Sequence, residues 1–238
     1  MTQNLSAGNV DTKGGNGMEV GKDVTKKRAP REWSRREEIA NGASHAVGFL
    51  AALAATPFLL STAMHHGGVG RVMGAGIFAA SCMFLYLSSA LLHGLAAERP
   101  KKFFEVLDHA AIFLLIAGTY TPFALGVLWG PWGWLLLSVI WPLAIFGVLV
   151  TTVRGIPSFR FNTSLYLGMG WFMICLFKPL SVRVPARCLV LLLAGGLAYS
   201  AGLLFYVARR VPYHHLAWHL AVLLGTACHY LAVWQYAL

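Results

Sequence analysis

The sequence is poor in acidic residues and in charge of either sign. Nine Asp and Glu stand against 19 Lys and Arg, and charged residues make up only 12% of the 238 positions. After Glu38 the remaining acids are Glu98, Glu105 and Asp108. Hydrophobic residues make up 57% of the chain, more than a soluble domain of this length carries. The composition excludes an ordinary soluble protein and indicates an integral membrane protein.

Cysteine is also scarce, and its pattern carries no chemistry. The four cysteines show no Cys-x-x-Cys spacing and lie in or beside apolar stretches, where they are expected to pack as small hydrophobic side chains. The net charge of +10 does not indicate nucleic-acid binding, because the basic residues lie in the N-terminal region and in short loops. In those places they contact lipid headgroups. Membrane lipids are therefore the expected partners.

The chain is predicted to divide at about residue 32. Residues 1–32 lack an apolar run and are rich in Gly, Asn, Thr, Lys and Asp, so we predict a disordered cytosolic tail there. No signal peptide is predicted, and Trp33 with its basic neighbours is expected to anchor at headgroup level. Ser34 and Glu37 have the spacing of a capping box, which predicts a helix start.

Residues 33–238 are predicted to form an all-α domain of seven transmembrane helices, since a span needs about 20 mostly apolar residues. The predicted spans are 41–63, 71–93, 108–127, 132–152, 163–179, 187–208 and 215–236. With the tail, one side of the membrane holds Arg99, Lys101, Lys102, Arg154, Arg160, Arg209 and Arg210, whereas the other holds Arg71, Lys178, Arg183 and Arg187. The positive-inside rule then predicts a cytosolic N-terminus and an external C-terminus, in the bacterial plasma membrane.

Three histidines are predicted to meet at the cytosolic boundary. His215 and His219 lie one turn apart on one face of the last span, and His93 ends the second span. Three imidazoles and a water form a tetrahedral zinc set with an open position, in which the water has a pKa of about 7. Asp108 is expected to act as general base or to orient a histidine, and Ser89 to bond the water or an oxyanion.

Each of these residues also has a structural interpretation. An intramembrane histidine often only bonds a neighbouring helix, and Asp108 is a candidate N-cap of the third span. Glu38, Asn41 and His45 share one face of the first span, where they either line the same cavity or bond one another. Their spacing leaves the role of His45 open.

Four sequence segments resemble the hemolysin III family, the bacterial branch of the progestin and adipoQ receptor group. They are residues 38–45 (EIANGASH), Ser89-x-x-x-His93, residues 107–123 (LDHAAIFLLIAGTYTPF) and His215-x-x-x-His219. The resemblance implies a seven-helix fold with a cytosolic N-terminus and a zinc ion held by His93, His215 and His219. It also implies that Asp108 and Ser89 lie near the zinc-bound water.

The expected function is a zinc-dependent hydrolase that cleaves an amide or ester of a lipid with a long acyl chain, since relatives of the family resemble ceramidases. Whether the chain is an enzyme is left open by the sequence. One alternative is a pore-forming cytolysin, as the family name implies, although the spans show no charged stripe that could line a wide channel. Another is a membrane-lipid sensor or receptor in which zinc is structural.

Overall fold

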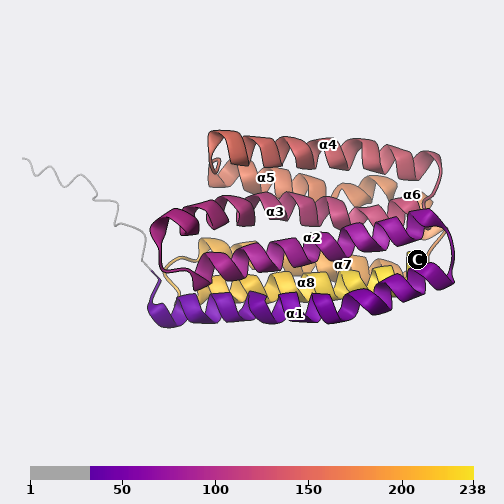
Figure 1. The fold of residues 1–238 in the computed structure, drawn as a ribbon. Helices are drawn as coiled ribbons and strands as arrows, with labels where there is room; N and C mark the ends of the chain where they lie inside the picture. The colour runs from indigo at the N-terminus through magenta and orange to yellow at the C-terminus, as the bar shows by residue number, and fades with distance from the viewer. Residues whose placement is uncertain (1–32) are drawn as a thin grey trace, which may run out of the picture. The chain divides into compact units, whose positions relative to one another are not determined.

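The structure is a computed structural model that describes residues 33–238, so the predicted tail lies outside the described part of the chain. The described residues form eight α-helices and one 3-10 helix. They are α1 (Arg35–His65), α2 (Val69–Gly94), α3 (Glu98–Leu125), α4 (Pro131–Arg154), α5 (Phe159–Gly170), η1 (Phe172–Leu176), α6 (Phe177–Ser181), α7 (Ala186–Val207) and α8 (His214–Tyr236). Figure 1 shows these helices running side by side along one bundle.

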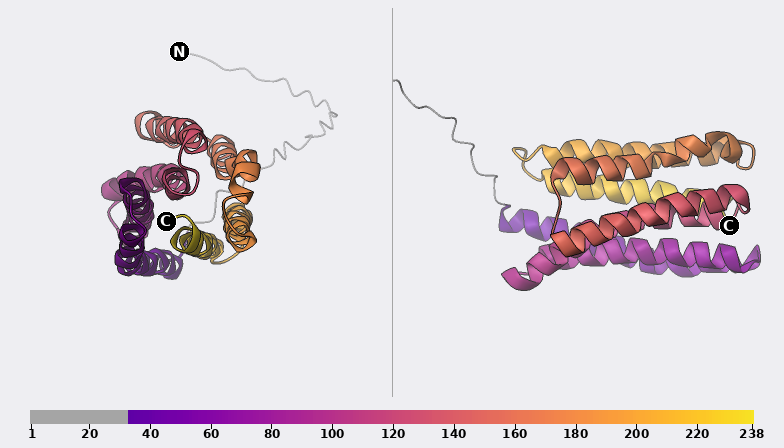
Figure 2. Two further views of the ribbon diagram at one scale, coloured as in Figure 1. Left: turned by 90° about the vertical axis from the view of Figure 1, so that its right-hand side faces the viewer. Right: turned by 90° about the horizontal axis from the view of Figure 1, so that it is seen from above.

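Seven helical segments between residues 33 and 238 are long and apolar enough to cross a membrane, as the sequence predicted. The fifth of these combines α5, η1 and α6. Seen end-on, the helices follow one another around the bundle, and α8 packs between α7 and α1 (Figure 2). The described domain is therefore that of a multi-pass membrane protein.

Two helices begin earlier than their apolar stretches. α1 starts at Arg35 because Ser34 and Glu37 form the predicted capping box. α3 starts at Glu98, with Ala97 as its N-cap residue, so Asp108 lies inside the helix. The N-cap interpretation of Asp108 is therefore wrong, because a charged first turn extends α3 beyond its apolar part.

The fifth span is interrupted where α5 ends at Gly170, in the segment with the shortest predicted span. Tyr120 of α3 bridges the break: its hydroxyl lies 2.8 Å from the Met169 carbonyl oxygen and 2.6 Å from that of Gly170. The hydroxyl oxygen also accepts the Met173 N–H at 3.3 Å. An interrupted helix is tolerated at membrane depth when protein groups bond the freed backbone, and Tyr120 supplies such a group.

Glycines allow close contacts between two of the helices. A Cβ at Gly74 of α2 would lie 2.8 Å from Pro122 Cα, and one at Gly70 would lie 2.9 Å from the Leu125 carbonyl oxygen. Both partners belong to α3. Small residues at such positions let helix backbones approach within the membrane. The resulting contact between α2 and α3 brings the end of α2 beside the first half of α3, where the candidate site lies.

Candidate metal centre

Two helix ends bring the three predicted histidines together. His93 is the penultimate residue of α2, whereas His215 and His219 occupy the first two turns of α8. The C-terminal end of α2 and the N-terminal end of α8 meet at the end of the bundle where α1 begins (Figure 1). All three histidines are buried, with exposed fractions of 5%, 7% and 1%.

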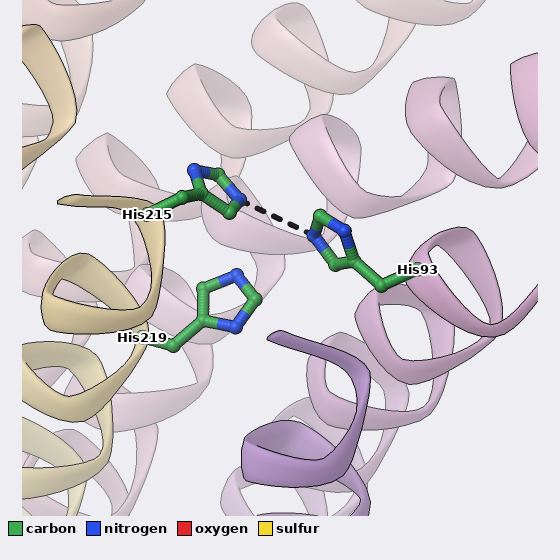
Figure 3. Close-up of side chains that lie close together, drawn as sticks. All are labelled: His93, His215 and His219. Carbon is green, nitrogen blue, oxygen red and sulfur yellow. Dashed lines mark hydrogen bonds between the residues drawn. The ribbon is translucent and has the colours of Figure 1, made fainter. Parts of the chain in front are cut away.

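The three imidazoles offer nitrogen atoms that all lie within 4.8 Å of one another. Their rings point toward a common centre in Figure 3, and Nε2 of His215 lies 3.2 Å from Nε2 of His93. Nitrogens bound to one tetrahedral zinc ion at 2.0–2.1 Å stand about 3.3 Å apart. The residues present therefore fit a metal ion held by three histidines.

The surroundings of the rings favour the same interpretation. Nδ1 of His93 donates to Glu38 Oε2 at 2.7 Å, and Nδ1 of His219 donates to the Asn41 carbonyl oxygen at 3.1 Å. A neutral imidazole that donates from Nδ1 keeps a lone pair on Nε2, the form in which it binds a metal. α1 thus supplies no member of the three-histidine cluster, but it orients two of them.

His45 lies beside the cluster without joining it. Its ring stacks on that of His219, with centroids 3.8 Å apart and planes 9° apart. Its two ring nitrogens have no hydrogen-bond partner among the described residues. Because stacked rings direct their nitrogens parallel to one another, His45 is not placed to share an ion with His219. Of the three residues on the predicted face of α1, Glu38 and His45 contact the cluster through their side chains, and Asn41 contacts it through its backbone carbonyl oxygen.

Two other histidines lie away from the cluster. Nδ1 of His109 approaches the Glu105 carbonyl oxygen at 2.9 Å, and Nε2 of His229 approaches the Leu192 carbonyl oxygen at 3.2 Å. Both contacts are ordinary hydrogen bonds to backbone. These two residues therefore follow the structural interpretation of an intramembrane histidine.

Asp108 and Ser89 lie close to the histidines. The Asp108 carboxyl is near Ser89 and His93, and it lines a polar cavity. Ser89 lies one turn before His93 in α2, is fully buried, and has a hydroxyl without a hydrogen-bond partner among the described residues. A buried hydroxyl needs a partner, which either the neighbouring Asp108 carboxyl or a bound molecule would supply.

Trp33 covers the cluster, which the sequence did not predict. Its ring centroid lies 4.5 Å from that of His215 and 5.3 Å from that of His93. Its indole N–H approaches Nε2 of His214 at 3.4 Å. Trp33 therefore packs on the histidines, a contact that no pattern in the sequence signalled, and its predicted anchoring at headgroup level stays a prediction.

Two cavities adjoin this region. The polar cavity has a volume of about 540 Å³, and His215, Asp108 and several charged residues of α3 line it. An apolar cavity of about 440 Å³ extends between α3, the interrupted fifth span, α7 and α8. Ile112, Tyr166, Leu203 and Trp218 line both cavities, so the polar chamber and the apolar chamber share a wall.

Fold and cluster together define a seven-helix membrane protein with a buried three-histidine site. A family described as "Haemolysin-III related" matches residues 33–230. The chain belongs to the hemolysin III family. It is 40% identical over 201 residues to the "Hemolysin-3 homolog" of Bacillus subtilis (strain 168), covering 84% of this chain and 94% of the relative.

The chain is also similar to a second bacterial protein and to an animal protein. "Hemolysin-3" of Bacillus cereus is 41% identical over 203 residues, covering 85% of this chain and 93% of the relative. The human "Monocyte to macrophage differentiation factor" is 27% identical over 171 residues, covering 68% of this chain and 69% of the relative. The bacterial relatives thus match almost end to end, and the animal relative matches over about two thirds.

Proposed function

We propose that the protein is a zinc-dependent hydrolase that cleaves an amide or ester bond of a membrane lipid. The observation that carries the proposal is the position of the three-histidine cluster beside Asp108, at the wall of a polar cavity that adjoins an apolar one. His93, His215 and His219 would hold the metal. Imidazole suits several transition metals, and three protein ligands with an open fourth position are typical of catalytic zinc.

A zinc ion held by these residues would lower the pKa of a bound water to about 7 and would polarise a carbonyl oxygen. Asp108 would take the proton of the attacking water and pass it to the leaving amine or alcohol. The Ser89 hydroxyl would donate a hydrogen bond to the carbonyl oxygen as negative charge develops there. One C–N or C–O bond breaks, and the water oxygen ends in the fatty acid.

The apolar cavity would hold the acyl chain of the substrate. Its lining is almost wholly aliphatic and aromatic, and it lies between the interrupted fifth span and α7. α5, η1 and α6 make few close backbone contacts with α7, so this side of the bundle is the natural entry for a chain that arrives from the bilayer. The polar cavity, with Glu98, Lys101 and Arg209 in its wall, would receive the headgroup.

We infer that the site faces the cytosol. Of the basic residues at or near the ends of the spans, those at the cluster end of the bundle, including Arg99 and Arg210, outnumber those at the opposite end. The positive-inside rule assigns the richer side to the cytosol. The reacting lipid would then come from the inner leaflet.

The test is hydrolysis by the purified chain in lipid nanodiscs. We expect wild-type protein with bound zinc to release fatty acid from at least one member of a panel of lipid amides and esters. His93→Ala should release none under the same conditions. Zinc-loaded wild type that releases no fatty acid from any lipid in the panel would overturn the proposal.

A cytolysin is the second candidate, because two Bacillus relatives carry the name hemolysin. Dye leakage from liposomes separates the two functions. A pore would cause leakage that persists in His93→Ala, because the histidine cluster plays no part in opening a channel. A hydrolase would cause no leakage before its products accumulate.

A further inference from the structure

The two ring nitrogens of His93 make different contacts. Nε2 faces the cluster, 3.2 Å from Nε2 of His215, and Nδ1 contacts Glu38 Oε2 at 2.7 Å. The His93 side chain is fully buried, and that of Glu38 is 20% exposed. The contact joins α1 to α2 across 55 positions of sequence.

A carboxylate at this distance constrains the imidazole in two ways. It accepts a hydrogen bond, so it selects the tautomer with its proton on Nδ1 and leaves the Nε2 lone pair free. It also holds the plane of the ring, because the hydrogen bond is directional. Partners of this kind tune a metal-binding histidine, and their loss typically lowers metal affinity about 10- to 100-fold.

Glu38 also contacts Lys101 through its second carboxylate oxygen. Lys101 Nζ contacts Glu38 Oε1 at 2.5 Å, and the Lys101 side chain is 33% exposed. Lys101 belongs to α3 and lines the polar cavity. The three side chains therefore form a continuous chain of contacts from the cavity wall, through Glu38, to His93.

We propose that Glu38 is a positioning residue that sets the tautomer and orientation of His93, and that Lys101 holds Glu38 in place. The inference rests on the proposed metal-binding role of the three histidines. Glu38 contacts the Nδ1 atom of His93, which faces away from the centre of the cluster, and it lines neither cavity, so it would act through His93. A purely structural ion pair would stabilise the bundle without affecting the affinity for the metal.

The experiment measures zinc affinity by competition with a chelator, together with the thermal unfolding of the metal-free protein. Glu38→Gln keeps the shape of the side chain but removes its charge, and we expect it to weaken zinc binding by about 10-fold or more. Glu98→Gln is the matched control, because it removes a carboxylate at the start of α3 that lines the polar cavity, as Lys101 does. It should bind zinc as wild type does.

A second pair of variants tests the inference even if Glu38→Gln fails to fold. Lys101→Met should weaken zinc binding less than Glu38→Gln does, and Lys102→Met, which alters a neighbouring lysine of the same cavity, should not weaken it. The visible spectrum of the Co²⁺-loaded protein should change in Glu38→Gln, because the hydrogen bond to one ligand loses its charged acceptor.

The outcomes separate this inference from the proposed function. Unaltered zinc affinity in Glu38→Gln, with a lowered unfolding temperature of the metal-free protein, would show a structural ion pair and overturn the inference alone. Failure of the wild type to bind zinc would overturn both. Weaker binding with an unchanged unfolding temperature would support the positioning role.

Discussion

The Nε2 atoms of His93 and His215 lie 3.2 Å apart, although 122 positions separate the two residues in sequence. Two imidazole nitrogens approach so closely either to share a proton or to share a cation. Nδ1 of His93 already donates to a carboxylate, and Nδ1 of His215 has no partner among the described residues. The arrangement is one that a metal ion would complete.

Removal of any one of the three histidines should abolish metal binding. We expect wild type to hold about one zinc ion per chain, and His93→Ala, His215→Ala and His219→Ala to hold only traces, since two imidazoles make a weak site. Elemental analysis of the purified proteins measures this directly. His229→Ala is the control, because its ring bonds the Leu192 carbonyl oxygen. Full zinc in all three variants would contradict the proposed site.

Asp108→Asn should separate metal binding from catalysis. The amide has nearly the shape of the carboxyl but cannot take up a proton, so zinc content should be unchanged while the rate of fatty-acid release falls by roughly 10²-fold or more. Glu105→Gln, one turn earlier in α3 and in the wall of the same cavity, should retain the wild-type rate. Equal rates for Asp108→Asn and wild type would remove Asp108 from the mechanism.

Gly170→Leu should shift the preference toward shorter acyl chains. Gly170 lines the apolar cavity, and a Cβ placed there meets no atom within 4 Å, so a larger side chain would occupy space proposed for the lipid. Rates for a series of substrates of increasing chain length measure the shift. Gly168→Leu, two residues earlier in α5, has similar space but does not line the cavity. An unchanged chain-length profile in Gly170→Leu would place the acyl chain elsewhere.

Gly133→Ala should destabilise the bundle. A Cβ at Gly133 of α4 would fall on the backbone carbonyl oxygen of Ala124 in α3, and a backbone atom cannot rotate away as a side chain can. Overpacking of this kind costs about 1–3 kcal/mol. Thermal unfolding in detergent should show a lower midpoint for Gly133→Ala and no loss for Gly76→Ala, whose Cβ meets no atom within 4 Å. Equal midpoints would show that α3 and α4 can separate at little cost.

Composition and spacing predicted the parts of the molecule that depend on local sequence. Apolar runs of spanning length predicted the seven membrane helices, and the four-residue spacing of His215 and His219 predicted their shared face on α8. Topology then brought His93 to the same end. Each of these steps rests on helix geometry, which is the same in any protein.

The contacts between helices were harder to predict from the sequence. Glu38 was expected on a polar face of α1, but its bond to His93 depends on the rotation of α1 against α2, and hydrophobic periodicity describes that rotation poorly in a membrane, where most faces are apolar. The cover provided by Trp33 and the bridge provided by Tyr120 are likewise contacts between residues distant in sequence. Helix starts were misjudged where charged turns extend beyond the apolar run, as at Glu98.

The dependence of the cluster on α8 has a consequence for biosynthesis. His219 bonds the Asn41 carbonyl oxygen across 178 positions, and the ribosome makes α8 last. Chains emerge at about 5–20 residues per second, so α1 and α2 are synthesised many seconds before α8. During that interval Asn41 and His93 lack their neighbours on α8. The three-histidine cluster can therefore form only after translation of α8, and a chain truncated before His214 would insert most of its helices yet never assemble the site.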